Sequence, residues 1–372
     1  MLNDARSGPA QSALNDALAL LAGLFSGAGY TPLAAPYLFP GNVLLDVYGE
    51  DLRARAFLFP DQGRGNELCL RPDFTVPVAL AHGESGWDRQ AAYAYQGPVF
   101  RNQPQGQDRP VEYLQAGIER FGDVDAVTAD AQIFALLHRG LAALGIGRPQ
   151  ATIGDLAIPF ALLDALDMPD HRRTALRRHF WRPNRFQDLL RRACAPHNPS
   201  KSRMALLTDP AWEDQISKAG EAIGLRKTSD VVQRLGDLAR EAKAPPMRRA
   251  DADLIGAVLG WHGPAMEGPA ALRALTSDTT IGAAVGRMEA RLDALADQGI
   301  DLSRLIFDAS FGRNLEYYDG FVFEMRAPGQ GEHPPLAGGG RYDSMTTRLG
   351  APEAVPAIGG IIRPEAVLES RS

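Results

Sequence analysis

The segment that decides the fold spans residues 93–121 and reads YAYQGPVFRNQPQGQDRPVEYLQAGIERF. Two strand-like runs, Tyr93–Phe100 and Tyr113–Phe121, flank a polar loop from Asn102 to Pro110. Apolar-rich runs separated by such a loop are typical of a β-hairpin. The sequence therefore predicts one long hairpin, beside which other strands of a sheet can assemble.

Polar residues recur at every second position of the returning strand. Gln115, Gly117 and Glu119 share one face, because successive side chains of a strand point to opposite faces. Such a row is normally the solvent face of a sheet. The alternative is that Tyr113, Gln115 and Glu119 line a cleft with Arg101 opposite, and the hairpin alone does not decide between the two.

Further strand-like runs occur before and after a stretch that has helical periodicity. They are Ala56–Phe59, Leu68–Leu70, Leu305–Ala309, Phe321–Met325 and Ala357–Ile362. Strands on both sides of the helical stretch must complete one sheet. We therefore expect an α+β domain formed by residues 1–150 and 275–372, interrupted by a mainly helical insertion at 151–274. The period of Leu14, Leu18, Leu21 and Phe25 also predicts an amphipathic first helix over Ser12–Phe25, ended by Gly27 and Gly29.

The composition is that of a globular protein, with 45% hydrophobic and 23% charged residues in a chain of 372. A net charge of −6 argues against a polyanion-binding chain as a whole. Cys69 and Cys194 are the two cysteines, which fits a reducing cytoplasm and offers no disulfide framework or zinc site. The apolar stretch Ala17–Tyr30 is too short to span a bilayer. We expect a cytoplasmic protein without a membrane segment, cofactor or metal.

The insertion contains a strongly basic segment. Between His171 and Arg203 there are nine arginines and one lysine against the single acid Asp188, and Phe180, Trp181 and Phe186 lie among them. Arginines interleaved with aromatic residues occur in RNA-binding proteins. The usual meaning of such a run is a solvated helix face, and a surface for a protein partner is a third interpretation. We favour the last two over nucleic-acid binding.

Residues 70–75 read LRPDFT. Pro72 ends the preceding strand, because it restricts the residue before it to an extended backbone. On an extended chain Asp73 and Thr75 point the same way, and a carboxylate beside a hydroxyl suits an ammonium group. The alternative is a helix N-cap, for which Asp and Thr are both good residues. Spacing alone favours the cap.

Two more clusters lie near the C-terminus. Residues 312–324 read GRNLEYYDGFVFE and residues 337–343 read AGGGRYD. Three consecutive glycines permit a positive φ or a close approach of the backbone to a ligand. The pattern is neither G-x-G-x-x-G nor a Walker A motif, and a bulged hairpin is the alternative.

In this order, the four clusters resemble the catalytic domain of histidyl-tRNA synthetase. LRPDFT is similar to its L-R-P-E-x-T segment, and the hairpin to class II motif 2 with its final Q-x-G-x-E. RNLEYY and AGGGRYD resemble R-G-L-D-Y-Y and A-G-G-G-R-Y-D, and Gly29-Tyr30 with Pro36 resembles motif 1, the dimerisation element. The resemblance covers roughly residues 10–150 and 275–370. It implies a class II aminoacyl-tRNA synthetase-like antiparallel sheet flanked by helices, usually in a homodimer.

The resemblance also implies a pocket for L-histidine. The residues implied to form it are Asp73, Thr75 and Gln115 for the α-amino group, Arg101 and Arg313 for the carboxylate, and Glu119, Tyr317, Tyr318 and Tyr342 for the imidazole.

The chain departs from the synthetase pattern where ATP binds. Motif 2 of an active synthetase reads F-R-x-E, and here Gln103 takes the place of the glutamate. Motif 3 reads G-x-x-x-G-x-E-R, and here Arg363 replaces the second glycine and Ala366 replaces the arginine. A cationic clamp on phosphates is a large catalytic contribution. We therefore expect no catalytic residues and the loss of aminoacylation.

The chain ends at Ser372, shortly after motif 3, where a synthetase continues into an anticodon-binding domain, so we expect that domain to be absent. This combination resembles the regulatory subunits of short-form ATP phosphoribosyltransferase. The resemblance implies a hetero-octamer with the short catalytic subunit, support of the first step of histidine biosynthesis, and feedback control by histidine. The alternatives are a residual histidyl-tRNA synthetase-like adenylating enzyme, with Arg101, Arg313 and Arg363 around ATP, and an RNA-binding synthetase paralogue.

Overall fold

The computed structural model describes residues 6–43, 47–48, 54–61, 63, 67–103, 110–195, 200–208, 212–218, 228–276, 279–312, 317–331 and 333–371. The chain forms two compact units. The first consists of Met1–Pro159 and Leu259–Ser372, and the second of Phe160–Val258.

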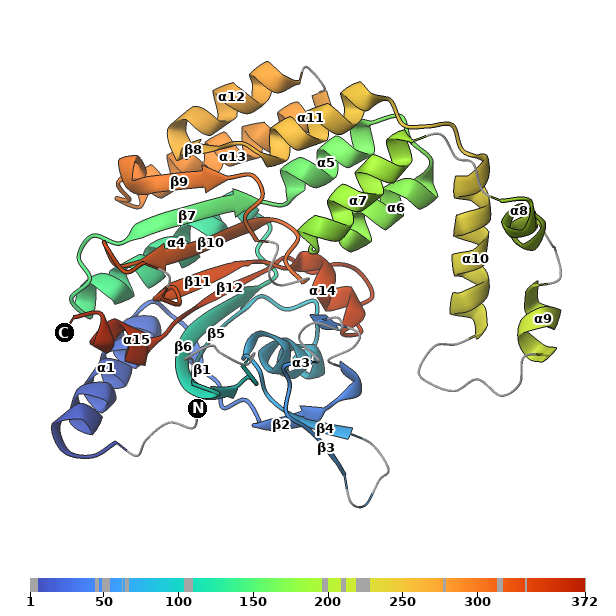
Figure 1. Ribbon diagram of the computed structural model, residues 1–372. Coiled ribbons are helices and arrows are strands. Elements are labelled where there is room, and N and C mark those ends of the chain that lie inside the picture. The colour runs from blue at the N-terminus through green and yellow to red at the C-terminus, as the bar shows by residue number, and fades with distance from the viewer. Residues whose placement is uncertain are drawn as a thin grey trace. The chain divides into compact units, whose positions relative to one another are not determined.

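A nine-stranded sheet forms the centre of the first unit (Figure 1). Its strands, in spatial order, are β1 (Thr31–Pro32), β5 (Ala91–Phe100), β6 (Glu112–Phe121), β12 (Ala357–Ile362), β11 (Ala337–Arg341), β10 (Phe321–Arg326), β7 (Gln150–Asp155), β9 (Leu305–Asp308) and β8 (His262–Pro264). The pairs β1–β5 and β7–β9 are parallel, and the other neighbouring pairs are antiparallel. A second, three-stranded sheet has the order β2 (Leu38–Pro40), β4 (Glu67–Leu70), β3 (Leu58–Pro60). The predicted α+β class and mostly antiparallel sheet are confirmed.

The helices of the first unit are α1 (Gly8–Gly27), α3 (Thr75–Ser85), α4 (Ala126–Ala143), α12 (Gly268–Leu275), α13 (Thr279–Asp297), α14 (Asp343–Arg348) and α15 (Pro364–Glu369), with 3-10 turns η1 (Ala265–Glu267) and η2 (Leu302–Arg304). Helices α1 and α4 pack on one face of the large sheet. Gly360 of β12 faces Leu137 of α4 on that side, and Gly140 of α4 comes close to Ile362 and Leu21. This face is therefore filled with apolar side chains, and the opposite face is available for a site.

The predicted first helix is present and is longer than expected. Leu14, Ala17, Leu21 and Phe25 form its buried side, as the period requires. The helix begins at Gly8 and ends at Gly27, and Gly29 follows with a φ of 88°. Glycine adopts this left-handed conformation without the steric cost that other residues carry.

The glycine-rich stretch 337–341 is a strand, β11, in the middle of the sheet. Its glycines allow close packing against the neighbouring strand, because a Cβ on Gly339 would lie 2.2 Å from the carbonyl oxygen of Gly359. Sequence patterns underestimate such a strand, since glycine is depleted in strands generally.

The helical insertion is shorter than the predicted 151–274. Residues 151–155 belong to β7, which pairs with β10 and β9, and residues 262–275 form β8, η1 and α12 of the first unit. The insertion corresponds to the second unit, Phe160–Val258. The second half of β7 is buried at consecutive positions and β8 is only three residues long, which explains why periodicity did not reveal them.

The second unit is helical where it is described. Its helices are α5 (Ala157–Ala165, which begins in the first unit), α6 (Asp170–His179), α7 (Pro183–Cys194), α8 (Lys201–Thr208), α9 (Trp212–Lys218), α10 (Thr228–Lys243) and α11 (Arg249–Leu259, which ends in the first unit). Phe180 and Phe186 are fully buried in its core, with ring centroids 5.8 Å apart. They therefore do not offer exposed faces for stacking with bases. Trp181, the third aromatic residue of the segment, is half-buried and contacts Phe160 and Phe180 edge to face, so the aromatic part of the RNA-binding interpretation is weakened.

Several arginines of the basic segment pair with acids inside the second unit. Arg172 donates to Glu241, Arg173 pairs with Asp170, and Arg191 pairs with Asp188.

Among the described residues, no helix is both long and apolar enough to cross a membrane. The same part of the chain contains no group of three or more His, Cys, Asp or Glu side chains arranged to hold a metal ion.

Candidate functional site

The site begins with the pairing of three strands. In the β5–β6 hairpin, Gly97 lies opposite Gln115 and Tyr93 opposite Glu119. On the other side of β6, Gly359 of β12 lies opposite Glu119. Residues directly opposite each other point to the same face of an antiparallel sheet. These residues therefore share the face that α1 and α4 leave uncovered. The polar row of the hairpin, Gln115, Gly117 and Glu119, is buried on this face and does not face solvent.

Glu119 is the centre of this face and is completely buried. Its Oε1 accepts hydrogen bonds from Thr75 Oγ1 at 2.9 Å and from Tyr95 Oη at 2.9 Å, and its Oε2 accepts one from Tyr342 Oη. Burial raises the pKa of Glu119 to about 7, against the lowering effect of these three hydroxyl donors. The carboxyl group is thus held in one orientation by hydroxyls from three separate segments.

Gly359 makes room for this carboxyl group. A Cβ at that position would lie 1.5 Å from Glu119 Oε2 and 2.7 Å from the carbonyl oxygen of Ile118. Only glycine fits, because real Cβ atoms do not approach other heavy atoms so closely. The first glycine of the motif 3-like stretch therefore has a defined role in the site.

Asp73 lies just before Phe74, the N-cap residue of α3, whose own side chain makes no capping hydrogen bond. Its Oδ1 accepts a hydrogen bond from Tyr48 Oη, and its Oδ2 lies 4.0 Å from Nη2 of Arg101. Burial raises the pKa of Asp73, although Arg101, the hydroxyl of Tyr48 and the first backbone N–H groups of α3 oppose this. The carboxylate therefore faces both the amino-terminal N–H groups of α3 and Arg101.

Two buried oxygen atoms of the site accept no hydrogen bond within the described part of the chain. They are Oδ2 of Asp73 and Oε1 of Gln115. The exposed fraction of these side chains is small, with 4% for Asp73 and 2% for Gln115. A buried acceptor without a donor costs about 1–3 kcal/mol. The arrangement therefore calls for a ligand that brings several N–H donors.

Arg101 supplies the opposite charge beside these acceptors. Its Nε donates to the carbonyl oxygen of Pro72 at 2.7 Å, and its side chain is 14% exposed. Burial lowers the pKa of Arg101, but the nearby Tyr113 and Asp73 raise it, and the net shift is upward. The guanidinium remains charged and keeps most of its N–H groups for a ligand.

Three tyrosines form an aromatic wall of the site. The ring centroid of Tyr317 lies 4.6 Å from that of Tyr318 and 6.0 Å from that of Tyr342. Tyr317 also contacts Tyr48 edge to face at 5.7 Å. Burial raises the pKa values of all three hydroxyls. The three hydroxyl groups stay protonated, so the wall carries no charge. Its aromatic rings can pack against a flat ring of a ligand.

The structure thus brings together eight of the nine residues predicted for the pocket: Asp73, Thr75, Arg101, Gln115, Glu119, Tyr317, Tyr318 and Tyr342. The ninth, Arg313, lies outside the described residues. Sequence reasoning missed Tyr48 and Tyr95, which bind the two carboxyl groups. The alternation of Tyr93, Tyr95 and Gly97 on one strand face was the available signal for Tyr95.

The three positions that depart from the synthetase pattern lie at separate places. Gln103 accepts from Nη2 of Arg55 at 3.1 Å and donates to the carbonyl oxygen of Pro110 at 3.0 Å. Arg363 follows β12, and Ala366 lies in α15, half-buried. Glu365 between them accepts from the backbone N–H of Leu114 at 2.7 Å, which ties α15 to the hairpin.

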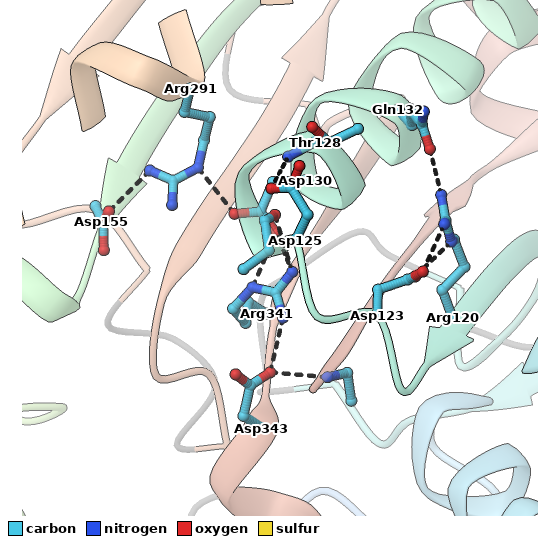
Figure 2. Close-up of polar contacts among 12 residues, drawn as sticks. Arg120, Asp123, Asp125, Thr128, Asp130, Gln132, Asp155, Arg291, Arg341 and Asp343 are labelled. Carbon is cyan, nitrogen blue, oxygen red and sulfur yellow. Dashed lines mark hydrogen bonds and ion pairs between the residues drawn. The ribbon is translucent and has the colours of Figure 1, made fainter. Parts of the chain in front are cut away.

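A buried network of charges fixes β11, the strand that ends directly before Tyr342 (Figure 2). Arg341 donates to Oδ1 of Asp130 at 2.6 Å and to Asp343 at 2.9 Å. Arg291 of α13 donates to Oδ2 of Asp130 and to Asp155, both at 2.8 Å. This network anchors β11 to α4, β7 and α13, and so positions the neighbouring Tyr342 above Glu119. Its acids were not singled out in the sequence, although Asp130 is a polar residue on the buried side of α4.

The raised pKa of Glu119 predicts a specific pH dependence of stability. In the folded protein without ligand, Glu119 holds its proton up to about pH 7, whereas in the unfolded chain the proton is lost near the ordinary value of 4.5. Between these values the folded state binds more protons, so this group lowers stability as pH rises, by at most about 1.4 kcal/mol per pH unit. We expect Glu119→Gln to remove this slope.

Urea unfolding of both proteins between pH 5 and 8 measures the effect. Other titrating groups, such as Asp319, are present in both proteins and cancel in the difference. Identical slopes for the wild type and Glu119→Gln would contradict the assignment.

Comparisons with known proteins agree with this geometry. A sequence profile of the family described as histidyl-tRNA synthetase matches residues 7–255 and 230–367. The chain is 35% identical over 358 residues to the ATP phosphoribosyltransferase regulatory subunit of Allorhizobium ampelinum, covering 90% of this chain and 92% of the relative. It is also 35% identical over 341 residues to the protein of the same name from Sinorhizobium fredii, covering 87% and 88%.

The fold is likewise shared with a solved structure. The crystal structure of an ATP phosphoribosyltransferase regulatory subunit/histidyl-tRNA synthetase from Bacillus halodurans matches with a TM-score of 0.70 and 22% identity, covering 100% of this chain and 82% of that one. Near-complete coverage by relatives at 35% identity makes the relationship plain. The chain belongs to the ATP phosphoribosyltransferase regulatory subunits, which share the histidyl-tRNA synthetase fold.

Proposed function

We propose that this chain is a cytoplasmic, non-catalytic regulatory subunit that binds the short catalytic subunit of ATP phosphoribosyltransferase and supports the first step of histidine biosynthesis. The name shared by its relatives supports this role. We further propose that the chain binds L-histidine and transmits feedback inhibition. Histidine then inhibits because it binds the inhibited assembly more tightly, as thermodynamic linkage requires.

The observation that carries the histidine proposal is the pair of buried acceptors without donors, Asp73 Oδ2 and Gln115 Oε1. An α-ammonium group supplies three N–H donors and a positive charge for this pair. Arg101 lies 4.0 Å from Asp73, so a carboxylate can bind beside the ammonium group. Glu119 and the tyrosine wall then receive a flat ring that carries an N–H donor. Histidine is the amino acid that has all of these features.

We propose that this chain forms a homodimer within a hetero-octamer. The apolar side chains of Tyr37 and Leu38 support a dimer, because they are 53% and 44% exposed and directly follow the motif 1-like segment. Large exposed apolar groups commonly mark protein interfaces. Light scattering of the isolated chain should then give twice the chain mass of 40.1 kDa, and a monomer would contradict the dimer.

The test is an activity assay of the short catalytic subunit from the same genome. We expect its turnover to rise when this chain is added and to fall again when histidine is titrated. Asp73→Asn keeps the size of the side chain and removes its charge, so we expect retained activation with histidine inhibition shifted to about 10- to 100-fold higher concentration.

The outcomes separate the two parts of the proposal. If turnover is unchanged and no complex forms, the regulatory role fails. If turnover rises but calorimetry detects no heat with millimolar histidine, the ligand proposal fails alone. Histidine-dependent exchange of pyrophosphate into ATP would instead favour the residual adenylating enzyme.

A further inference from the structure

Arg363 lies at the edge of the proposed pocket and has no role so far. The last pairing of β12 with β6 joins Ile362 to Ala116, so the next position places Arg363 beside Gln115. The backbone N–H of Arg363 donates to the carbonyl oxygen of Leu336 at 2.8 Å, which continues the ladder with β11. Arg363 lies two positions after Ile361 and four positions after Gly359, and Gly359 is paired with Glu119. The side chain of Arg363 is therefore on the same face of the sheet as those of Gln115 and Glu119.

The Arg363 guanidinium has no carboxylate within salt-bridge distance in the described part of the chain. Its Nη1 donates to the carbonyl oxygen of Pro335 at 2.6 Å. Glu324, the acid that acts electrostatically on Arg363, pairs with Nε of Arg326 at 2.8 Å. A partly buried cation with four unused N–H groups is therefore directed toward the site.

The guanidinium group of Arg101 interacts electrostatically with that of Arg363. Burial lowers the pKa of Arg363, and the positive charge of Arg101 lowers it further. Among the described residues, the acid in ion-pair distance of Arg101 is Asp73, at 4.0 Å. Two guanidinium groups within electrostatic reach of each other are stabilised when an anion lies between them.

We propose that Arg363 and Arg101 together hold the free carboxylate of the bound amino acid, so that the pocket selects unmodified histidine over forms in which the carboxyl group is amidated, esterified or activated. The proposal rests on the proposed histidine site. If the ammonium group binds Gln115 and Asp73, the carboxylate is attached to the same carbon atom, next to the strand position that Arg363 occupies. Directly opposite residues lie about 4.5–5.5 Å apart, which is within reach of such a ligand.

This assignment explains why a large cationic side chain is tolerated where the synthetase pattern has glycine. A synthetase must accept a nucleotide phosphate next to the carboxyl group and then form an adenylate, which carries no free carboxylate. A protein that only detects the amino acid has no such need. For it, a second arginine increases affinity for the product that accumulates and discriminates against activated or amidated forms.

The test compares L-histidine with L-histidinamide, which differs mainly in lacking the negative charge. In calorimetry we expect the wild type to bind histidine at least about 30-fold more tightly than histidinamide. Arg363→Gln should weaken histidine binding about 10- to 100-fold and change histidinamide binding less than about twofold. Arg363→Lys, which keeps the charge without the planar fork, should be intermediate. Arg287→Gln removes an exposed arginine of α13 and should change neither affinity.

Each outcome has one meaning. A wild type that binds neither ligand contradicts the proposed function itself. A wild type that binds both ligands equally overturns the carboxylate subsite, and this reading does not depend on any variant folding. If Arg363→Gln weakens both ligands by the same factor, or neither, Arg363 is only structural. Melting temperatures of the variants check that they are folded.

Discussion

Replacing Asp130 with alanine is expected to lower the free energy of unfolding by about 3–5 kcal/mol, the largest stability effect among the residues described. Asp130 is fully buried and each of its oxygens accepts from a different arginine, Oδ1 from Arg341 and Oδ2 from Arg291. Alanine would remove the acid and leave two guanidinium groups facing a cavity in the core.

In this variant the N–H groups of Arg291 and Arg341 cannot replace their hydrogen bonds to Asp130 with hydrogen bonds to water. Both are about 5% exposed, and their other partners, Asp155 and Asp343, are already engaged. Each arginine keeps one carboxylate partner, but the N–H groups that donated to Asp130 stay buried without an acceptor, and each such unpaired group costs about 1–3 kcal/mol. A loss of this size is a large part of the 5–15 kcal/mol by which a domain is typically stable.

Glu289→Ala is the matched control, since Glu289 lies on α13 two residues before Arg291. It pairs with Arg273, but the two side chains are 43% and 44% exposed. Exposed pairs contribute about 0–1 kcal/mol, so this variant should unfold at nearly the wild-type urea concentration. If Asp130→Ala and Glu289→Ala lost the same stability, the buried network would not be the anchor of β11.

The hairpin and most strands could be predicted because their patterns are local. Tyr93–Phe100 and Tyr113–Phe121 became β5 and β6 with nearly the predicted bounds, and the C-terminal runs became β9, β10 and β12. In contrast, β7 and β11 depend on neighbours distant in sequence. A run such as AGGGR forms a strand only because β10 and β12 lie on either side of it.

The site shows the same division between local and long-range information. Alternation placed Gln115 and Glu119 on one face, but it could not decide whether that face is solvated. The answer came from contacts with Thr75, Tyr95 and Tyr342, which are up to 223 residues away. For Asp73, local statistics favoured a helix cap, and the first N–H groups of α3 do act on its carboxylate, but the sequence could not show that Tyr48 and Arg101 also contact it.

Gly359→Ala is expected to weaken histidine binding in the proposed pocket by at least about 100-fold, although it removes none of the predicted ligand-binding side chains. The reason is steric. The new Cβ would lie 1.5 Å from Glu119 Oε2, so the carboxyl group must leave its position and lose its hydrogen bonds with Thr75, Tyr95 and Tyr342. Losing a charge-assisted contact to the ligand ring costs about 1.5–3 kcal/mol, and displaced buried polar groups add to it.

Gly286→Ala provides the control, because a Cβ at this position of α13 would meet nothing within 4 Å. It should keep histidine affinity and gain up to about 1 kcal/mol of stability, since alanine is the better helix residue. Calorimetry measures both affinities.

A double-mutant cycle tests the cause of the effect. In a Glu119→Ala background the carboxyl group that collides with the new methyl group is gone. Gly359→Ala should then cost only what its second contact, 2.7 Å from the carbonyl oxygen of Ile118, imposes on the backbone. We therefore expect strongly non-additive effects on histidine affinity. Additive losses would mean that Gly359 acts on the strand pairing of β12 with β6 rather than on Glu119, and that the orientation of this carboxyl group does not limit binding.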